Sequence, residues 1–123
     1  MGHYFTFKNT DLPIVEQVGG KGLSLLYSEK KGFAVPTVAI LSTNFFAPWM
    51  EELKRTQEWK AFANVKDEGM GSAALAVKKR SQTFAFTDDQ QQTLGEIRQY
   101  LQAEGITLMA VRSSSPEEDL EGT

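Results

Sequence analysis

Continuous apolar runs and helically spaced apolar stripes alternate along this sequence. The runs at residues 37–42 (TVAILS) and 106–111 (ITLMAV) predict strands, the first of them central in its sheet and the second buried on both faces. A weaker run at residues 4–7 (YFTF) predicts a short edge strand. We therefore expect a sheet assembled from segments at both ends and in the middle of the chain.

Helical spacing of apolar residues predicts the elements between these runs. The predicted helices lie within residues 23–32, 45–53, 58–62, 70–80 and 87–105, and residues 67–72 are predicted to be a loop. Pro48 should make the first turn of the second helix irregular. A capping box from Thr87 to Gln90 begins the last helix, and Gly105 ends it. Strands alternating with helices predict a mixed α/β (α+β) layer fold in one domain, residues 1–123.

The last predicted strand leads directly into residues that suit an anion. Arg112, Ser113 and Ser114 follow it at its carboxyl end, which is where ligands bind in open α/β sheets. Ser115, the following proline and the glutamates after it have the pattern of a helix N-terminus. A guanidinium group, hydroxyl groups and helix-start amides within so few residues predict a phosphate receptor.

A glycine-rich segment precedes the first predicted helix and allows two interpretations. Gly19, Gly20 and Gly22 would let the backbone approach a ligand closely, with Lys21 as a mobile positive charge. The spacing matches neither a Walker A loop nor the dinucleotide-binding pattern. Taken alone, the segment is more typical of a tight turn into a helix than of a ligand site.

Two further motifs have a structural and a functional interpretation, and in both we favour the structural one. The aromatic stripe of residues 45–53 suits core packing better than stacking on a base. The basic run of residues 78–80 suits the negative end of a helix dipole better than a phosphate site.

Composition narrows the class of protein. The sequence is 41% hydrophobic and 24% charged with a net charge of −3, which is typical of a globular domain and argues against nucleic acid as a main partner. It contains no cysteine and a single histidine, His3, which lacks the companions that a metal or catalytic site needs. No membrane-spanning run or signal peptide is recognisable, so we expect a cytoplasmic protein without a membrane partner.

Three segments together resemble one enzyme family. Residues 19–25 (GGKGLSL) resemble the GGKGASL segment of phosphoenolpyruvate synthase and pyruvate phosphate dikinase. Residues 35–46 are similar to that family's VPPGFVITTEAF, and residues 111–120 to its VRSSATAEDL. The three segments occur in the family's order and spacing, although residues 55–86 carry no motif.

The resemblance implies the N-terminal part of an ATP-grasp nucleotide-binding domain in a multidomain dikinase. Such an enzyme cleaves ATP to AMP with Mg²⁺ and phosphorylates a histidine on another domain, from which pyruvate receives the phosphoryl group. The implied partners are therefore ATP and the remaining domains: the second half of the ATP-grasp domain, the phosphohistidine domain and the pyruvate domain. The implied catalytic residue is Arg112. The implied ATP-binding residues are Gly20, Lys21, Gly22, Arg112, Ser113, Ser114, Gly122 and Thr123.

The sequence also departs from the family and leaves alternatives open. Leu26 replaces a frequent glycine, and Thr37 and Val38 replace proline and glycine. The chain stops where the family's glycine-rich loop begins, so we expect a fragment that is inactive alone and whose metal ligands lie elsewhere. Acidic residues 117–119 are better explained as helix-start residues than as metal ligands. The acceptor could instead be an antibiotic, as in the rifampicin phosphotransferases, or the chain could be a non-catalytic interaction module.

Overall fold

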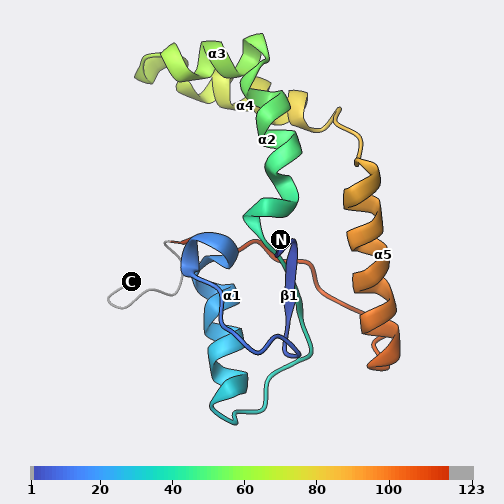
Figure 1. The fold of residues 1–123 in the computed structure, drawn as a ribbon. Coiled ribbons are helices and arrows are strands. Elements are labelled where there is room, and N and C mark those ends of the chain that lie inside the picture. Colours follow the sequence, from blue (N-terminus) through green and yellow to red (C-terminus); the bar gives the residue numbers. More distant parts are fainter. Residues whose placement is uncertain (1, 117–123) are drawn as a thin grey trace. The chain divides into compact units, whose positions relative to one another are not determined.

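The computed structural model describes residues 2–116 of the chain. It has a mixed α+β fold that is mostly helical, with five α-helices and a two-stranded sheet in the described part. The chain forms two compact units (Figure 1). Unit 1 combines Met1–Phe45 with Asp89–Thr123, and unit 2 consists of Phe46–Asp88.

The sheet of unit 1 is smaller than the sequence predicts. β1 (Tyr4–Thr6) pairs antiparallel with β2 (Ala39–Leu41), with Phe5 opposite Ile40. Beyond β2, the Ser42 N–H donates to the His3 carbonyl at 2.9 Å and the Ser42 hydroxyl donates to the Gly2 carbonyl. The edge strand predicted near residue 4 is confirmed. The prediction of a central strand at residues 37–42 is wrong, because within residues 2–116 β2 has one strand neighbour and its residues stay half-buried.

The strand predicted at residues 106–111 is not formed. This segment has no regular secondary structure, and Leu108 and Val111 are 90% and 92% exposed. A strand exists only where another strand satisfies its backbone groups, and no strand of the described chain pairs with this one. The apolar run therefore crosses unit 1 as an exposed connection from the end of α5 to the beginning of α1 (red in Figure 1).

Two long helices complete unit 1. α1 (Val15–Lys30) stops where Gly32 adopts a φ of +90°, as the sequence predicts, but it begins well before the predicted start. α5 (Asp88–Ala103) matches its prediction and is followed by Gly105 at φ +78°. The Gln90 side chain donates to the Phe45 carbonyl at 2.9 Å and fixes the first turn of α5. The buried apolar residues of unit 1 are Val18, Leu26, Phe45 and Leu101.

Unit 2 is a set of helices without strands in the described chain. A 3₁₀ turn, η1 (Thr43–Phe46), leads into α2 (Ala47–Lys54), so the irregular start expected from Pro48 is confirmed. α3 (Gln57–Asn64) follows, with the Thr56 hydroxyl accepting from the Trp59 N–H at 3.2 Å as an N-cap. The predicted loop at residues 67–72 is instead η2 (Asp67–Gly69) followed directly by α4 (Met70–Ser81).

The aromatic stripe of α2 is only partly core. Leu53 is buried, whereas Phe46 and Met50 are exposed. Trp49 lies between these extremes, because its ring stacks on Phe86 with centroids 5.0 Å apart and its indole N–H donates to the Ala85 carbonyl at 3.0 Å. The basic residues 78–80 lie in the last turn of α4, where they suit the helix dipole as expected.

Candidate functional site

The glycine-rich segment forms a break inside α1. Gly19 has φ +78° and ψ 167°, which is not helical, so a first turn before it and a longer stretch after it meet at an angle. This backbone region is essentially restricted to glycine. The longer stretch begins directly after Gly19, so Gly20 and Gly22 lie within the helix, whereas the prediction placed them before it. The extra first turn was missed, although the Gln17 side chain, which accepts from the Ile14 N–H at 3.1 Å, is a local signal for it.

The glycine segment and the serine segment meet in the structure. The Gly22 N–H donates to the Ser114 hydroxyl oxygen at 3.1 Å, across 92 residues of sequence. The Gly20 N–H donates to the Ser115 carbonyl at 2.7 Å. We call this contact between residues 19–22 and 114–115 the seam. It joins the glycine segment, which by itself is more typical of a tight turn into a helix, to the serine segment, which is predicted to be a phosphate receptor.

Other parts of the chain approach two of these glycines closely. A Cβ atom on Gly19 would lie 2.2 Å from the Ser114 hydroxyl oxygen and 2.6 Å from its carbonyl carbon, which is closer than atoms can approach. A Cβ on Gly22 would lie 3.3 Å from Cγ2 of Ile40 in β2. The absence of a side chain at Gly19 therefore leaves room for the serine segment, and its absence at Gly22 leaves room for Ile40. Gly19 was missed as a site residue, although it belongs to the glycine pattern that drew attention to the segment.

The two predicted cations lie at or beside the seam. Lys21 is half-buried and sits between the two glycines whose amides make the seam. Arg112 is exposed and lies two residues before Ser114. The expectation that Arg112 stands at the carboxyl end of a strand is wrong, because no strand forms there. The segment is brought to α1 by the seam instead.

The remaining predicted ATP-binding residues have different fates. Ser113 is exposed next to Arg112. Gly20 and Gly22 are buried, and their amides donate to the chain's own serine segment. Gly122 and Thr123 lie outside the described residues, as do acidic residues 117–119 and the helix predicted there.

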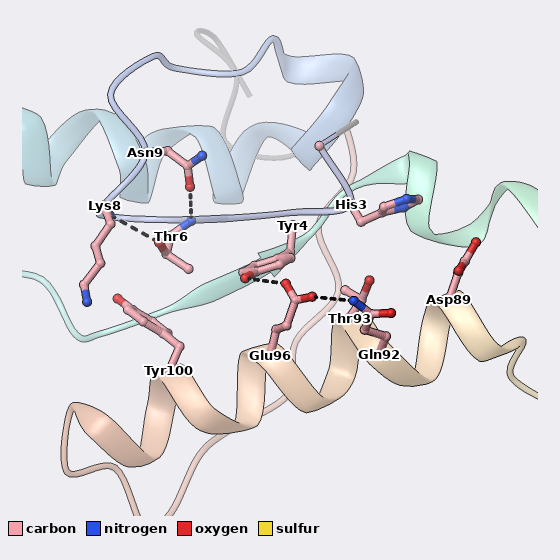
Figure 2. Close-up of a pocket in the computed structure, with 11 residues that line it drawn as sticks. His3, Tyr4, Thr6, Lys8, Asn9, Asp89, Gln92, Thr93, Glu96 and Tyr100 are labelled. Atoms are coloured by element: carbon pink, nitrogen blue, oxygen red, sulfur yellow. Dashed lines mark hydrogen bonds between the residues drawn. The ribbon is translucent and has the colours of Figure 1, made fainter.

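A second feature of unit 1 is an open hollow of about 660 Å³ between β1 and α5 (Figure 2). One face of α5 lines it with polar side chains at helical spacing: Asp89, Gln92, Thr93, Glu96 and Tyr100. The Tyr4 hydroxyl donates to Glu96 Oε1 at 3.1 Å across the hollow. The apolar stripe of this helix is predicted from the sequence, whereas this polar face is not.

The two tyrosines of the hollow hold their protons more tightly than free tyrosine does. Burial, followed by the hydrogen bond to Glu96 and the charge of that carboxylate, raises the pKa of Tyr4. Burial and the charge of Glu104 raise the pKa of Tyr100, against a lowering by its hydrogen bond with Thr6. His3 also lines the hollow, but the described residues contain no group of three metal-ligating side chains there or elsewhere.

Comparison with known proteins gives no match to a family model, a curated protein or a solved structure. Across residues 2–116, no helix is both long and apolar enough to cross a bilayer. What the fold and the seam define by themselves is a mixed α+β unit in which two cation-bearing segments are tied together at a glycine break.

Proposed function

We propose that this chain contributes one wall of the ATP site in a dikinase resembling phosphoenolpyruvate synthase, as part of an ATP-grasp domain. The observation that carries the proposal is the seam, which joins the glycine segment of Lys21 to the serine segment of Arg112. The resemblance assigns both segments to one triphosphate site. The contact between them supports that assignment, because such a site requires them to be neighbours.

The chemistry of the two cations fits this role. Phosphoryl transfer depends mainly on positioning and on compensating charge on the phosphate oxygens. Arg112 offers a planar fork suited to two oxygens, and Lys21 offers a point charge on a flexible stem. The amides of Gly20 and Gly22 are engaged by residues 114–115, so the cationic side chains carry the interaction with phosphate.

The metal ion, the phosphohistidine and the acceptor of the proposed reaction are bound by other residues than those of this chain. A bound Mg²⁺ would supply compensation for the negative charge of the phosphate groups in this chemistry. The resemblance implies that the metal ligands lie in other parts of the enzyme, and we assign them there. We assign the phosphohistidine domain and the acceptor domain to other parts of the enzyme as well. The acceptor is pyruvate, or an antibiotic as in the rifampicin phosphotransferases. We further propose that the enzyme is cytoplasmic.

A non-catalytic interaction module is the second candidate function. The exposed apolar run favours it, since Leu108, Met109 and Val111 are all more than half exposed, and such surfaces commonly mark contacts with other proteins. In this case the seam would serve only to hold the run in place.

Calorimetry of ATP binding with Mg²⁺ distinguishes the two candidates. We would compare this chain with a version extended by about one domain length, roughly 150–200 residues. Binding by the extended version, and its loss by at least tenfold in Arg112→Ala with the fold intact, is expected for the dikinase. Absence of binding in two folded proteins would favour the interaction module. Loss of folding in Arg112→Ala would identify Arg112 as structural.

A further inference from the structure

We infer that Ser114 is a positioning residue that fixes Arg112 relative to Lys21 and does not itself contact the nucleotide. This inference rests on the proposed function, because it describes how the same ATP site is held together. It reassigns Ser114, which the sequence marks as a ligand contact.

The first argument is that the seam is the anchor of the segment that carries Arg112. In the described chain, residues 107–113 make no hydrogen bond, and they have no strand partner. The first bonds after this exposed stretch are those of Ser114 and Ser115 to α1. The position of Arg112, two residues earlier, is therefore set by the seam.

The second argument is that the same bonds surround Lys21. Its neighbours on both sides, Gly20 and Gly22, are the two donors of the seam. One pair of hydrogen bonds thus fixes the backbone on which each cation stands. By accepting from the Gly22 N–H, the Ser114 hydroxyl links the two backbone segments that carry the charged side chains.

The third argument comes from Gly19, which is shaped to receive Ser114. Its backbone conformation is essentially restricted to glycine, and any Cβ would overlap the Ser114 hydroxyl. A tight turn into a helix would need neither this close approach nor a serine opposite it. The fit between Gly19 and Ser114 therefore indicates a built contact between the two segments.

The test uses the full-length protein that contains this sequence, with calorimetry of ATP binding in the presence of Mg²⁺. Ser114→Ala should weaken ATP binding about tenfold, the size of effect expected when a hydrogen bond that orders a charged ligand group is lost. Combined with Arg112→Ala, it should have no further effect beyond about twofold, because the serine acts through the arginine. The control is Ser72→Ala on exposed α4, which should bind ATP as the unaltered protein does.

Two further measurements keep the inference testable. Hydrogen exchange of the Gly22 amide should be faster in Ser114→Ala, which reports the broken bond directly. Gly19→Ala is a second route to the same break, and its effect on ATP binding should also vanish in the Arg112→Ala background. Thermal melting of each variant shows whether it is folded.

Each remaining outcome has a definite meaning. Unchanged ATP affinity in a folded Ser114→Ala protein overturns the inference and leaves the proposed function standing. An equal loss with and without Arg112 overturns it as well, because Ser114 would then not act through Arg112. Tighter binding overturns it by showing that the hydroxyl blocks the site. Failure of the unaltered full-length protein to bind ATP overturns the proposed function and this inference together.

Discussion

Two apolar runs of similar composition have different fates in this protein. Residues 37–42 contribute β2, which pairs with β1 and packs Ile40 against Gly22 of α1. Residues 106–111 stay irregular and exposed. The difference is not in the side chains, since both runs have the composition of a strand. It lies in whether another strand satisfies the hydrogen-bonding groups of the backbone. An apolar run therefore predicts a strand only where a second strand is available to pair with it.

The two runs are also anchored differently. At the end of the paired run, Ser42 is 1% exposed and bonds to Gly2 and His3. Beyond the unpaired run, Ser114 is exposed and bonds to a glycine at the break in α1. The first anchor adds hydrogen bonds at the end of a sheet, whereas the second holds a segment that has no strand partner. Four experiments test this comparison.

The largest effect is expected from Gly19→Ala, which attacks the anchor of the unpaired run. Strained backbone and the overlap with Ser114 should lower the free energy of unfolding by about 3 kcal/mol. Gly95→Ala is the matched control, because a Cβ there meets nothing within 4 Å, and it should stabilise the helix by about 0.5–1 kcal/mol. Urea unfolding measures both. Equal effects of the two substitutions would show that the seam does not form.

The contrast between the runs themselves is tested with aspartate. Ile40→Asp should cost about 2 kcal/mol, since it places a charge in the half-buried contact between β2 and α1. Leu108→Asp should change the free energy of unfolding by less than about 0.5 kcal/mol, because that side chain is already in water. A cost above 1 kcal/mol at Leu108 would mean that the second run is buried in solution.

The anchor of the paired run should give a smaller effect. Ser42→Ala removes the buried hydroxyl that donates to the Gly2 carbonyl and should cost about 1 kcal/mol in urea unfolding. Ser72→Ala on exposed α4 should be close to neutral. If the two serines behave alike, the bond from residue 42 to the N-terminal segment contributes nothing to stability.

The smallest effect is expected on the pH dependence of stability, through Tyr4, which pairs with Leu41 in the sheet. The folded protein raises the pKa of Tyr4 above its ordinary value of 10.0, so it binds the phenolic proton more tightly than the unfolded chain does. This contribution to stability is complete below pH 10.0 and is lost as the pH rises through the pKa of the folded protein. Tyr4→Phe should therefore lose less stability than the unaltered protein in that alkaline range. Tyrosinate absorbance during titration follows the proton directly, and identical pH profiles would contradict the raised pKa of Tyr4.

Most of the local structure could be predicted from the sequence. The capping residues, glycine stops and helical stripes located α3, α4 and α5 to within a few residues, and the expected stop of α1 at Gly32 is confirmed. These features are local, because the groups that begin and end a helix are its immediate neighbours in the chain. The conformational demand on the glycine segment was equally visible, since it is a property of the residue type.

Pairing and proximity were decided by the tertiary structure alone. The resemblance assigned residues 19–22 and 112–115 to one ATP site, but the sequence could not show that Gly22 and Ser114 bond across 92 residues. It also overestimated the sheet, because a strand needs a partner whose identity no local pattern encodes. The sequence located most of the helices, the glycine segment and the charged residues beside it. The tertiary structure decided which apolar run became a strand and brought the two segments together, because long-range contacts depend on the packing of the whole unit.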